Sequence, residues 1–363
     1  MNVLILAKDS HLGGLTTCCG NLAQGLIQHL KDNVVIGMNN GEGARKLAKD
    51  YKVEYLSFGG KNPLAMLKTY KQIGKLIKEN EIDVIHAQNR IPALFAAVYC
   101  FFNRKVNYIW ANHLVPVPSG FVHRLLSRYG YCVVSEGIAG KVMLVRDLHI
   151  PENKVRIVNL GVDLSKFVKT SVDEQESLKE QFGIKEGEKV ILLYGRLCEN
   201  KGHLFLMDAL GKVKNRNFKL IFPGKDDEFK RLVDEKANKY GLTDNIIYPG
   251  FVNGPACLSI CDLMVLPSRK EGFPQACVEA YAMGVPVIRT KNGGYEDTQD
   301  MCFGVDFGDV DALTELLQNF FDNPEIYSER AKVALQKVGR LSIERMAEEY
   351  HAIYQEAIDA RKK

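Results

Sequence analysis

Two glutamates, Glu271 and Glu279, lie eight positions apart around a Gly-Phe-Pro turn. Pro274 suits the first position of a helix, where its missing N–H costs nothing, and Gly284 suits the residue after the helix end. The backbone N–H groups at such a helix start can hold an anion. Because two carboxylates would repel a diphosphate, we expect them to accept hydrogen bonds from hydroxyl pairs, as a sugar and a ribose offer. The segment predicts a loop that binds a sugar nucleotide.

Two cations, Arg196 and Lys201, flank a second loop upstream. An apolar run over 190–194 ends at Gly195, and a helical pattern begins near His203. A buried strand, a glycine turn and a helix place both cations at the carboxyl edge of a parallel sheet, where α/β proteins bind ligands. Arginine grips phosphate oxygens bidentately and lysine acts as a point charge. The pair is therefore predicted to neutralise the charge on a departing nucleoside diphosphate.

The elements that must position these loops alternate along the chain. Short apolar runs at 3–6, 34–38 and 83–87 are separated by longer periodic segments, and the alternation resumes from Val190. This is the βαβ pattern of doubly wound parallel sheets. The polar stretch 169–188 has few β formers, so we predict that it separates two α/β units, with the boundary near residue 166.

These elements resemble, in order and separation, the retaining glycosyltransferases of family 4. The resemblance covers nearly the whole chain and is carried by segments around Gly13, DVIHAQ, His113, NLGVDLSKF, GRLCENKG, EGFPQACVEAYAMGVPVI and GGYED. It implies the GT-B fold, an α/β architecture of two Rossmann-like doubly wound domains facing a deep crevice. Residues 1–165, with a returning helix at about 345–363, would form the acceptor-side domain. Residues 166–344 would form the domain that binds the nucleotide sugar.

The resemblance also implies the activity and the residues that carry it. The enzyme would move a sugar from a nucleoside-diphosphate sugar to a hydroxyl of a glycan or lipid-linked acceptor, with retained configuration and with no metal or other cofactor. The predicted catalytic residues are Arg196, Lys201, Glu271 and His113. The predicted substrate-binding residues are Gly13, Gly14, His86, Gly224, Lys225, Gly250, Phe251, Val252, Gly272, Phe273, Pro274, Gln275, Glu279 and Glu296.

Several of these assignments have a plain structural alternative. The pair Gly13-Gly14 follows the first strand, where side chains would obstruct a phosphate or sugar, but a tight turn would also explain it. A lone histidine such as His86 or His113 is more often a structural residue than a ligand contact. Gly293-Gly294, before Glu296, could equally be a simple turn. The nucleotide remains open among UDP, GDP and ADP, because the base is read largely by backbone groups in the resembling family.

Composition narrows the class of protein. A chain of 363 residues with 46% hydrophobic and 25% charged residues is typical of two globular domains. No apolar run approaches the roughly 20 residues that span a bilayer, and we expect a cytoplasmic protein. Nine cysteines, an odd number, are scattered through expected strands and helices. We interpret them as reduced packing residues rather than a disulfide framework.

Positive charge is concentrated in the first part of the chain. Residues 1–168 hold 21 Lys and Arg against 12 Asp and Glu. The segment 61–80 predicts a helix with an apolar stripe (Leu64, Leu67, Ile73, Leu76 and Ile77) and lysines on another face. Two interpretations stay open: a solvated helix packed on the sheet, or a helix at an anionic membrane, such as the inner face of the cytoplasmic membrane. Nucleic acid is not an expected partner, because no motif interleaves aromatic residues with cations.

Two functions of other classes also stay open. Paired carboxylates serve glycoside hydrolases, although those need no phosphate cradle. A sugar-nucleotide-binding subunit without transfer activity would carry the same loops. Turnover of a nucleotide sugar separates the transferase from both.

Overall fold

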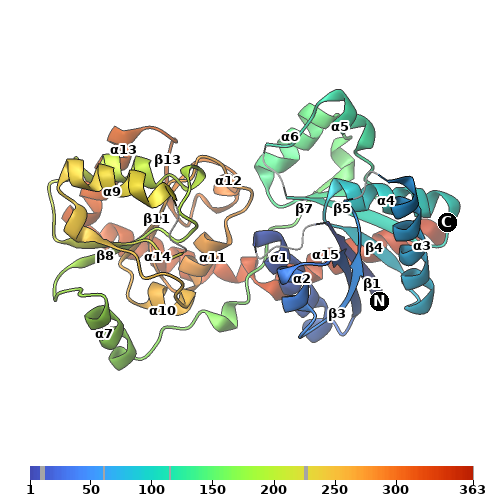
Figure 1. Ribbon diagram of the computed structural model, residues 1–363, viewed down its shortest axis with the longest axis horizontal. Helices are drawn as coiled ribbons and strands as arrows, with labels where there is room; N and C mark the ends of the chain where they lie inside the picture. The colour runs from blue at the N-terminus through green and yellow to red at the C-terminus, as the bar shows by residue number, and fades with distance from the viewer. Residues whose placement is uncertain (9–12, 60–61, 114–115, 225–227, 363) are drawn as a thin grey trace. The chain divides into compact units, whose positions relative to one another are not determined.

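The computed structural model describes residues 1–8, 13–59, 62–113, 116–224 and 228–362. The chain divides into two compact units (Figure 1). Unit 1 comprises Met1–Val162 and Leu341–Lys363, and unit 2 comprises Asp163–Arg340. Each unit is built on its own parallel sheet.

The sheet of unit 1 has the strand order β3-β2-β1-β4-β5-β6-β7, with every neighbouring pair parallel. The sequences of the central strands are nearly continuous apolar runs, because helices cover both faces of the sheet. The strands are β1 (Asn2–Ala7), β2 (Asn33–Asn39), β3 (Lys52–Leu56), β4 (Val84–Ala87), β5 (Asn107–Asn112), β6 (Val133–Ser135) and β7 (Val155–Ile157).

The helices of unit 1 lie on opposite faces of this sheet, because right-handed crossovers from β1 to β2 and from β4 to β5 run in opposite directions. On one face α1 contacts α15, and on the other α3 contacts α4. A short π-helical turn, Gly25–His29, extends α1. The helices are α1 (Gly14–Gln24), α2 (Glu42–Leu47), α3 (Pro63–Glu79), α4 (Arg90–Phe102), α5 (Phe121–Leu126), α6 (Ile138–Leu148) and α15 (Ile343–Lys362).

The last helix, α15, completes the core of unit 1. Its apolar stripe is buried: Met346, Tyr350, Ile353, Tyr354 and Ala357 are each at most 6% exposed. Gly25 allows α15 to approach closely, since a Cβ there would lie 2.6 Å from the carbonyl oxygen of Ile343 and 2.8 Å from Cβ of Ala347.

Unit 2 repeats the plan with the strand order β10-β9-β8-β11-β12-β13. Its strands are β8 (Lys189–Leu192), β9 (Phe218–Ile221), β10 (Ile246–Ile247), β11 (Leu263–Leu266), β12 (Val287–Thr290) and β13 (Phe303–Val305). Its helices are α7 (Val172–Gln181), α8 (His203–Leu210), α9 (Glu228–Tyr240), α10 (Gly254–Ser259), α11 (Gln275–Ala282), α12 (Tyr295–Thr298), α13 (Val310–Asp322) and α14 (Pro324–Lys337). Strand β13 was not predicted, because its three residues include a glycine and form no apolar run.

The chain passes from unit 1 to unit 2 after Val162, close to the boundary that we predicted near residue 166, and the polar stretch 169–188 follows this point. This stretch contains α7, which lies inside unit 2. A capping box starts this helix: Ser171 and Glu174 each accept a hydrogen bond from the backbone N–H of the other. Polarity here reflects an exposed helix, since none of its residues is buried.

The helix predicted over 61–80 is α3, and three of the five residues of its predicted apolar stripe are buried. Ile73, Leu76 and Ile77 pack into the core, but Leu64 and Leu67 are 75% and 49% exposed. All nine cysteines are free thiols, most of them buried, as predicted. None of the helices in the described ranges combines the length and the apolar character that a membrane span requires.

Candidate active site

The candidate site of unit 2 lies where the direction of the strand connections reverses. β8 and β11 are neighbours in the sheet, but the chain continues from β8 to β9 and from β11 to β12, on opposite sides. Loops therefore diverge at the carboxyl ends of these two strands, which is where open parallel sheets bind ligands. Arg196 and Lys201 follow β8, and Glu271 follows β11.

The two predicted cations have different surroundings. Lys201 Nζ lies 2.8 Å from Glu271 Oε1, and these side chains are 23% and 13% exposed. Gly195 leaves room for the lysine, because a Cβ there would lie 3.2 Å from Lys201 Cε. Arg196 is exposed and forms no ion pair or hydrogen bond with any residue that the structure describes. One cation is thus held beside a carboxylate and the other faces solvent.

Two hydrogen bonds and one close backbone approach hold the loops after β8 and β11 together. The N–H of Arg269 donates to the carbonyl of Asn200 at 2.7 Å, and Asn200 Nδ2 donates to the carbonyl of Lys270 at 2.9 Å. Gly202 has φ +75°, and a Cβ there would overlap the carbonyl oxygen of Pro267. These contacts fix the separation of Lys201 from Glu271.

Gly293 and Gly294 let the loop after β12 pack against the Gly-Phe-Pro turn. A Cβ on Gly293 would overlap the carbonyl oxygens of Glu271 and Gly272. A Cβ on Gly294 would lie 2.9 Å from the Phe273 ring, and the φ of Gly294 is +76°. The glycine pair is therefore required by close packing against the candidate site.

A buried arginine at the end of β12 donates hydrogen bonds to this loop. Arg289 is 1% exposed, and its Nη2 donates to the carbonyl of Gly293 at 2.6 Å and to Asn292 Oδ1 at 3.1 Å. Asn292 in turn donates to the carbonyl of Ser268 at 2.7 Å. Arg289 was not predicted, because it lies within β12 and no motif marks it.

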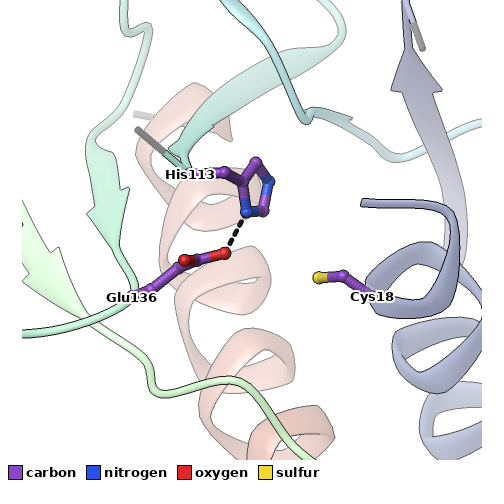
Figure 2. Close-up of side chains that lie close together, drawn as sticks. All are labelled: Cys18, His113 and Glu136. Atoms are coloured by element: carbon purple, nitrogen blue, oxygen red, sulfur yellow. Dashed lines mark hydrogen bonds and ion pairs between the residues drawn. The ribbon is translucent and has the colours of Figure 1, made fainter. Parts of the chain in front are cut away.

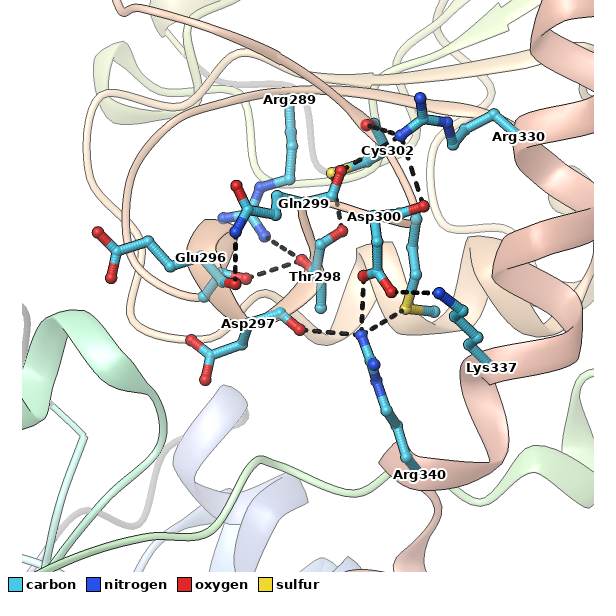
Figure 3. Close-up of polar contacts among 12 residues, drawn as sticks. Arg289, Glu296, Asp297, Thr298, Gln299, Asp300, Cys302, Arg330, Lys337 and Arg340 are labelled. Atoms are coloured by element: carbon cyan, nitrogen blue, oxygen red, sulfur yellow. Dashed lines mark hydrogen bonds and ion pairs between the residues drawn. The ribbon is translucent and has the colours of Figure 1, made fainter.

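Cations also hold the far end of α12, the helix that carries Glu296 (Figure 3). Arg330 donates to the carbonyls of Gln299, Asp300 and Cys302, where a helix end favours positive charge. Burial acts to raise the pKa of Asp300, but hydrogen bonds from Lys337 and Arg340 lower it below its usual value. The side chain of Glu296 points away from this network and is exposed.

Helix α11 carries the second predicted carboxylate. The helix begins at Gln275, so Pro274 precedes it by one residue instead of occupying its first position, while Gly284 has φ +65° as predicted. Glu279 is partly buried, and burial raises its pKa to about 7. Burial, together with the nearby charge of Glu279, raises the pKa of Tyr194 to about 12. Tyr194, which we did not predict, is thus a neighbour of Glu279.

The predicted nucleoside-binding residues follow β9 and β10. The N–H of Gly224 donates to the carbonyl of Gly250 at 2.8 Å, and both glycines have positive φ. A Cβ on Gly224 would lie 3.6 Å from the carbonyl oxygen of Gly195, which places this pair beside the loop of Arg196. Phe251 is 86% exposed and Val252 is partly buried. Lys225 lies outside the described residues.

The glycine pair of unit 1 has no structural requirement in the described residues. Gly13 has extended backbone, Gly14 starts α1, and a Cβ on either would meet nothing within 4 Å. Neither glycine has the positive φ that would by itself require glycine. Their bare backbone at a helix start suits close approach of a ligand.

His113 follows β5 and is held by two side chains. Nδ1 contacts Glu136 Oε1, and Nε2 lies 2.5 Å from Gln88 Oε1. The imidazole and the carboxylate are 12% and 9% exposed. Neither partner was predicted, although Glu136 follows buried strand β6 as His113 follows β5, a signal that the analysis used only for the histidine.

His86 does not line a ligand-facing surface, contrary to our prediction. It is fully buried, its Nδ1 lies 2.6 Å from the hydroxyl of Tyr354, and its ring centroid lies 4.7 Å from that of Tyr350. Burial, and to a lesser extent the nearby His113, lowers its pKa to about 3. His86 instead ties α15 to the sheet.

Known proteins share both halves of this architecture. The family model "Glycosyltransferase Family 4" matches residues 12–166, and "Glycosyl transferases group 1" matches residues 174–337. An uncharacterised glycosyltransferase of Methanocaldococcus jannaschii, MJ1607, is 27% identical over 78% of each chain. The UDP-Gal:alpha-D-GlcNAc-diphosphoundecaprenol alpha-1,3-galactosyltransferase of Escherichia coli is 23% identical over 71% of each chain.

Solved structures show the same fold. Anabaena HepE, in complex with UDP and glucose, superposes with a TM-score of 0.84 over 98% of this chain and 100% of that chain, at 19% identity. The two Rossmann-like units correspond to its GT-B architecture. The chain belongs to the group 1 glycosyltransferases.

Proposed function

We propose that this glycosyltransferase moves a sugar from a nucleoside-diphosphate sugar to a hydroxyl acceptor with retention of anomeric configuration. The observation that carries the proposal is the pairing of Lys201 with Glu271 beside the exposed Arg196, at the reversal point of the unit 2 sheet. A cation beside a carboxylate supplies what a sugar diphosphate needs, namely positive charge for phosphate oxygens and an acceptor for sugar hydroxyls.

The cations act on the leaving group. Arg196 and Lys201 stabilise the charge that develops on the departing diphosphate. Preorganised charge of this kind lowers the activation barrier substantially. The ion pair also removes the repulsion that an isolated Glu271 would exert on the donor. We assign this work to side-chain cations and give no metal a role in the transfer. No protein nucleophile is assigned, because the leaving phosphate itself takes the acceptor proton.

The remaining predicted residues bind the donor. Glu271 accepts hydrogen bonds from the sugar, Glu279 binds the ribose, and the N–H groups at the start of α11 bind phosphate or sugar. The nucleoside lies against the Gly224–Gly250 pair and Phe251. His113, in unit 1, contacts the transferred sugar.

We further propose a lipid-linked or cell-envelope acceptor, reached at the inner face of the cytoplasmic membrane. The E. coli relative is named for a diphosphoundecaprenol acceptor, which supports this class. A second support is the outer face of α3, where exposed Leu64 and Leu67 adjoin Lys68, Lys71 and Lys75 along a groove of about 390 Å³. Apolar side chains beside lysines suit an anionic lipid surface.

The test of the transfer chemistry needs no acceptor. Purified protein is incubated with UDP-, GDP- and ADP-sugars, and slow hydrolysis of the donor is followed by proton NMR, which reports the configuration of the first sugar released. We expect one nucleotide family to be consumed and the donor's own anomer to appear first. First appearance of the opposite anomer would contradict retention. Nucleotide binding without turnover, with or without acceptor lipids, would favour a non-catalytic subunit.

A further inference from the structure

Arg289 is a buried cation with only neutral groups around it. It is 1% exposed, and its guanidinium donates to the carbonyl of Gly293, to Asn292 Oδ1 and to Thr298 Oγ1, the last contact being visible in Figure 3. Its Nε has no partner in the described part of the chain, and no carboxylate there pairs with it. A buried charge without a counterion destabilises a fold unless something else compensates it.

Other buried charged groups of the chain show the usual compensation. Asp163 is 6% exposed, and its Oδ2 lies 2.9 Å from Lys166 Nζ. Glu136 is 8% exposed and contacts the imidazole of His113 (Figure 2). Arg289 differs from both, because its hydrogen bonds reach a carbonyl, an amide and a hydroxyl. Its positive charge therefore remains available to an anion that binds nearby.

One residue, Gly293, separates this guanidinium from the proposed donor site. Arg289 holds the Gly293 carbonyl at 2.6 Å, and a Cβ on Gly293 would overlap the carbonyl of Glu271. A buried thiol lies within reach of the same charges. Burial raises the pKa of Cys277 to about 12, while the charges of Arg289 and Lys201 both act to lower it. The field of Arg289 therefore extends to the loops on which Lys201 and Glu271 meet.

We infer that Arg289 is a positioning residue for the diphosphate of the donor, an inference that rests on the proposed function. Its hydrogen bond to Gly293 holds the loop after β12 against the Gly-Phe-Pro turn. Its charge attracts the diphosphate through this loop without touching it. A fixed charge inside a protein acts on an anion more strongly than the same charge does in water. The bound diphosphate is then the counterion that Arg289 lacks within the described chain.

The first test compares a nucleoside diphosphate with its nucleoside. UDP, GDP and ADP are titrated into the full chain and followed by NMR, and the nucleoside of the one that binds is titrated in the same way. Arg289→Gln should weaken binding of the nucleoside diphosphate by roughly 10-fold or more, as expected for one charge acting through a protein interior. Binding of the nucleoside, which lacks the diphosphate, should not change. Arg289→Lys keeps the charge and should bind the nucleoside diphosphate more tightly than Arg289→Gln does.

Arg216→Gln is the matched control for this test. Arg216 also donates to two backbone carbonyls, those of Leu210 and Gly211, but it lies before β9, at the amino end of the sheet. Its replacement removes hydrogen bonds of the same kind without removing charge from the proposed donor site. Arg216→Gln should bind the nucleoside diphosphate as wild type does.

A second pair of variants keeps the test valid if Arg289→Gln does not fold. Thr298→Asp places a carboxylate beside the guanidinium of Arg289, whereas Thr298→Asn has nearly the same size and no charge. Both variants lose the hydroxyl that Thr298 donates to the carbonyl of Gly294 at 2.7 Å, so they differ mainly in charge. Thr298→Asp should bind the nucleoside diphosphate several-fold more weakly than Thr298→Asn, with equal affinity for the nucleoside.

Three results would overturn the inference while wild type still binds a nucleotide, which leaves the donor site in place. Arg289→Gln could bind the nucleoside diphosphate as tightly as Arg216→Gln, Arg289→Lys could bind it no better than Arg289→Gln, or Thr298→Asp and Thr298→Asn could bind it equally. Failure of wild type to bind any of the three nucleotides would instead overturn the donor site, and this inference with it.

Discussion

The two units place polar residues at the same edge of similar parallel sheets, yet they treat charge differently. Unit 2 presents Arg196 to solvent and holds Lys201 beside Glu271 on loops at the sheet's reversal point. Unit 1 holds His113, Glu136 and Gln88 against one another, mostly out of water. The first arrangement can meet a mobile anion, whereas the second satisfies its own charges. We therefore propose phosphate chemistry for unit 2 and positioning for unit 1.

The glycines near the two sites also differ in their surroundings. Gly202, Gly293 and Gly294 of unit 2 lie where a Cβ would meet backbone or a ring of a neighbouring loop. Gly13 and Gly14 of unit 1 have open space around them and no left-handed backbone. Unit 2 therefore needs glycine to build its site, and unit 1 needs it only if a ligand approaches.

The largest effect is expected from Lys201→Ala. Removing a preorganised cation should raise the barrier by about 3 to 4 kcal/mol, or roughly 100- to 1,000-fold in the rate of nucleoside-diphosphate release. Lys212→Ala is the control, because Lys212 is an exposed lysine of the same unit that pairs with Asp311 at 2.7 Å. A Lys201→Ala variant as fast as Lys212→Ala would remove the role assigned to unit 2.

The next effect concerns the pH dependence of stability. Burial raises the pKa of Glu279 to about 7 from its usual 4.5. Between these values the native state binds the extra proton, so the free energy of unfolding falls as pH rises, by up to about 3 kcal/mol. Glu279→Gln should therefore gain stability relative to wild type at pH 8 but not at pH 4, as measured by urea unfolding. An equal difference at both pH values would contradict a raised pKa of Glu279 in the native state.

A smaller effect separates the two sets of glycines. Gly293→Ala should lower the free energy of unfolding by about 2 kcal/mol, because the added Cβ must displace the loop of Glu271. Gly14→Ala should leave stability unchanged or raise it by up to about 1 kcal/mol, since alanine favours the helix. Thermal unfolding of both variants measures this. Destabilisation by Gly14→Ala would show that the glycine pair has a structural role after all.

The smallest effect per residue is expected at the membrane. Lys68→Gln, Lys71→Gln and Lys75→Gln should each weaken binding to vesicles rich in phosphatidylglycerol by about 1 kcal/mol, with little change on neutral vesicles. Leu64→Ser should weaken binding, while Leu335→Ser, at a 51% exposed leucine of unit 2, should not. Flotation assays measure both. Equal binding of wild type and the lysine variants would leave α3 as an ordinary solvated helix.

Sequence reasoning succeeded where the signal is local. The strands of both sheets are apolar runs, and the Gly195 and Gly284 turns mark where elements end, so the α/β alternation could be predicted. The loops of Arg196 and Glu271 could also be predicted to lie near each other, because both follow buried strands of one parallel sheet.

Sequence reasoning failed where two residues in contact lie far apart in the sequence. The ion pair of Lys201 with Glu271 depends on contacts across 70 positions, and nothing in either segment specifies it. His86 has the same local pattern as a ligand-facing residue at a strand end, but Tyr350 and Tyr354 arrive from α15 and bury it. Leu64 and Leu67 fit a helical stripe, yet both lie outside the core and their side chains are exposed.

Nucleotide binding by calorimetry tests the central claim most directly, with UDP, GDP and ADP titrated into wild type, Arg196→Ala, Lys201→Ala and Glu279→Ala. We predict that one nucleotide binds wild type at a single site and that each variant binds it more weakly. Absence of binding by all three, or equal affinity in wild type and the variants, would contradict a donor site on the loops of unit 2.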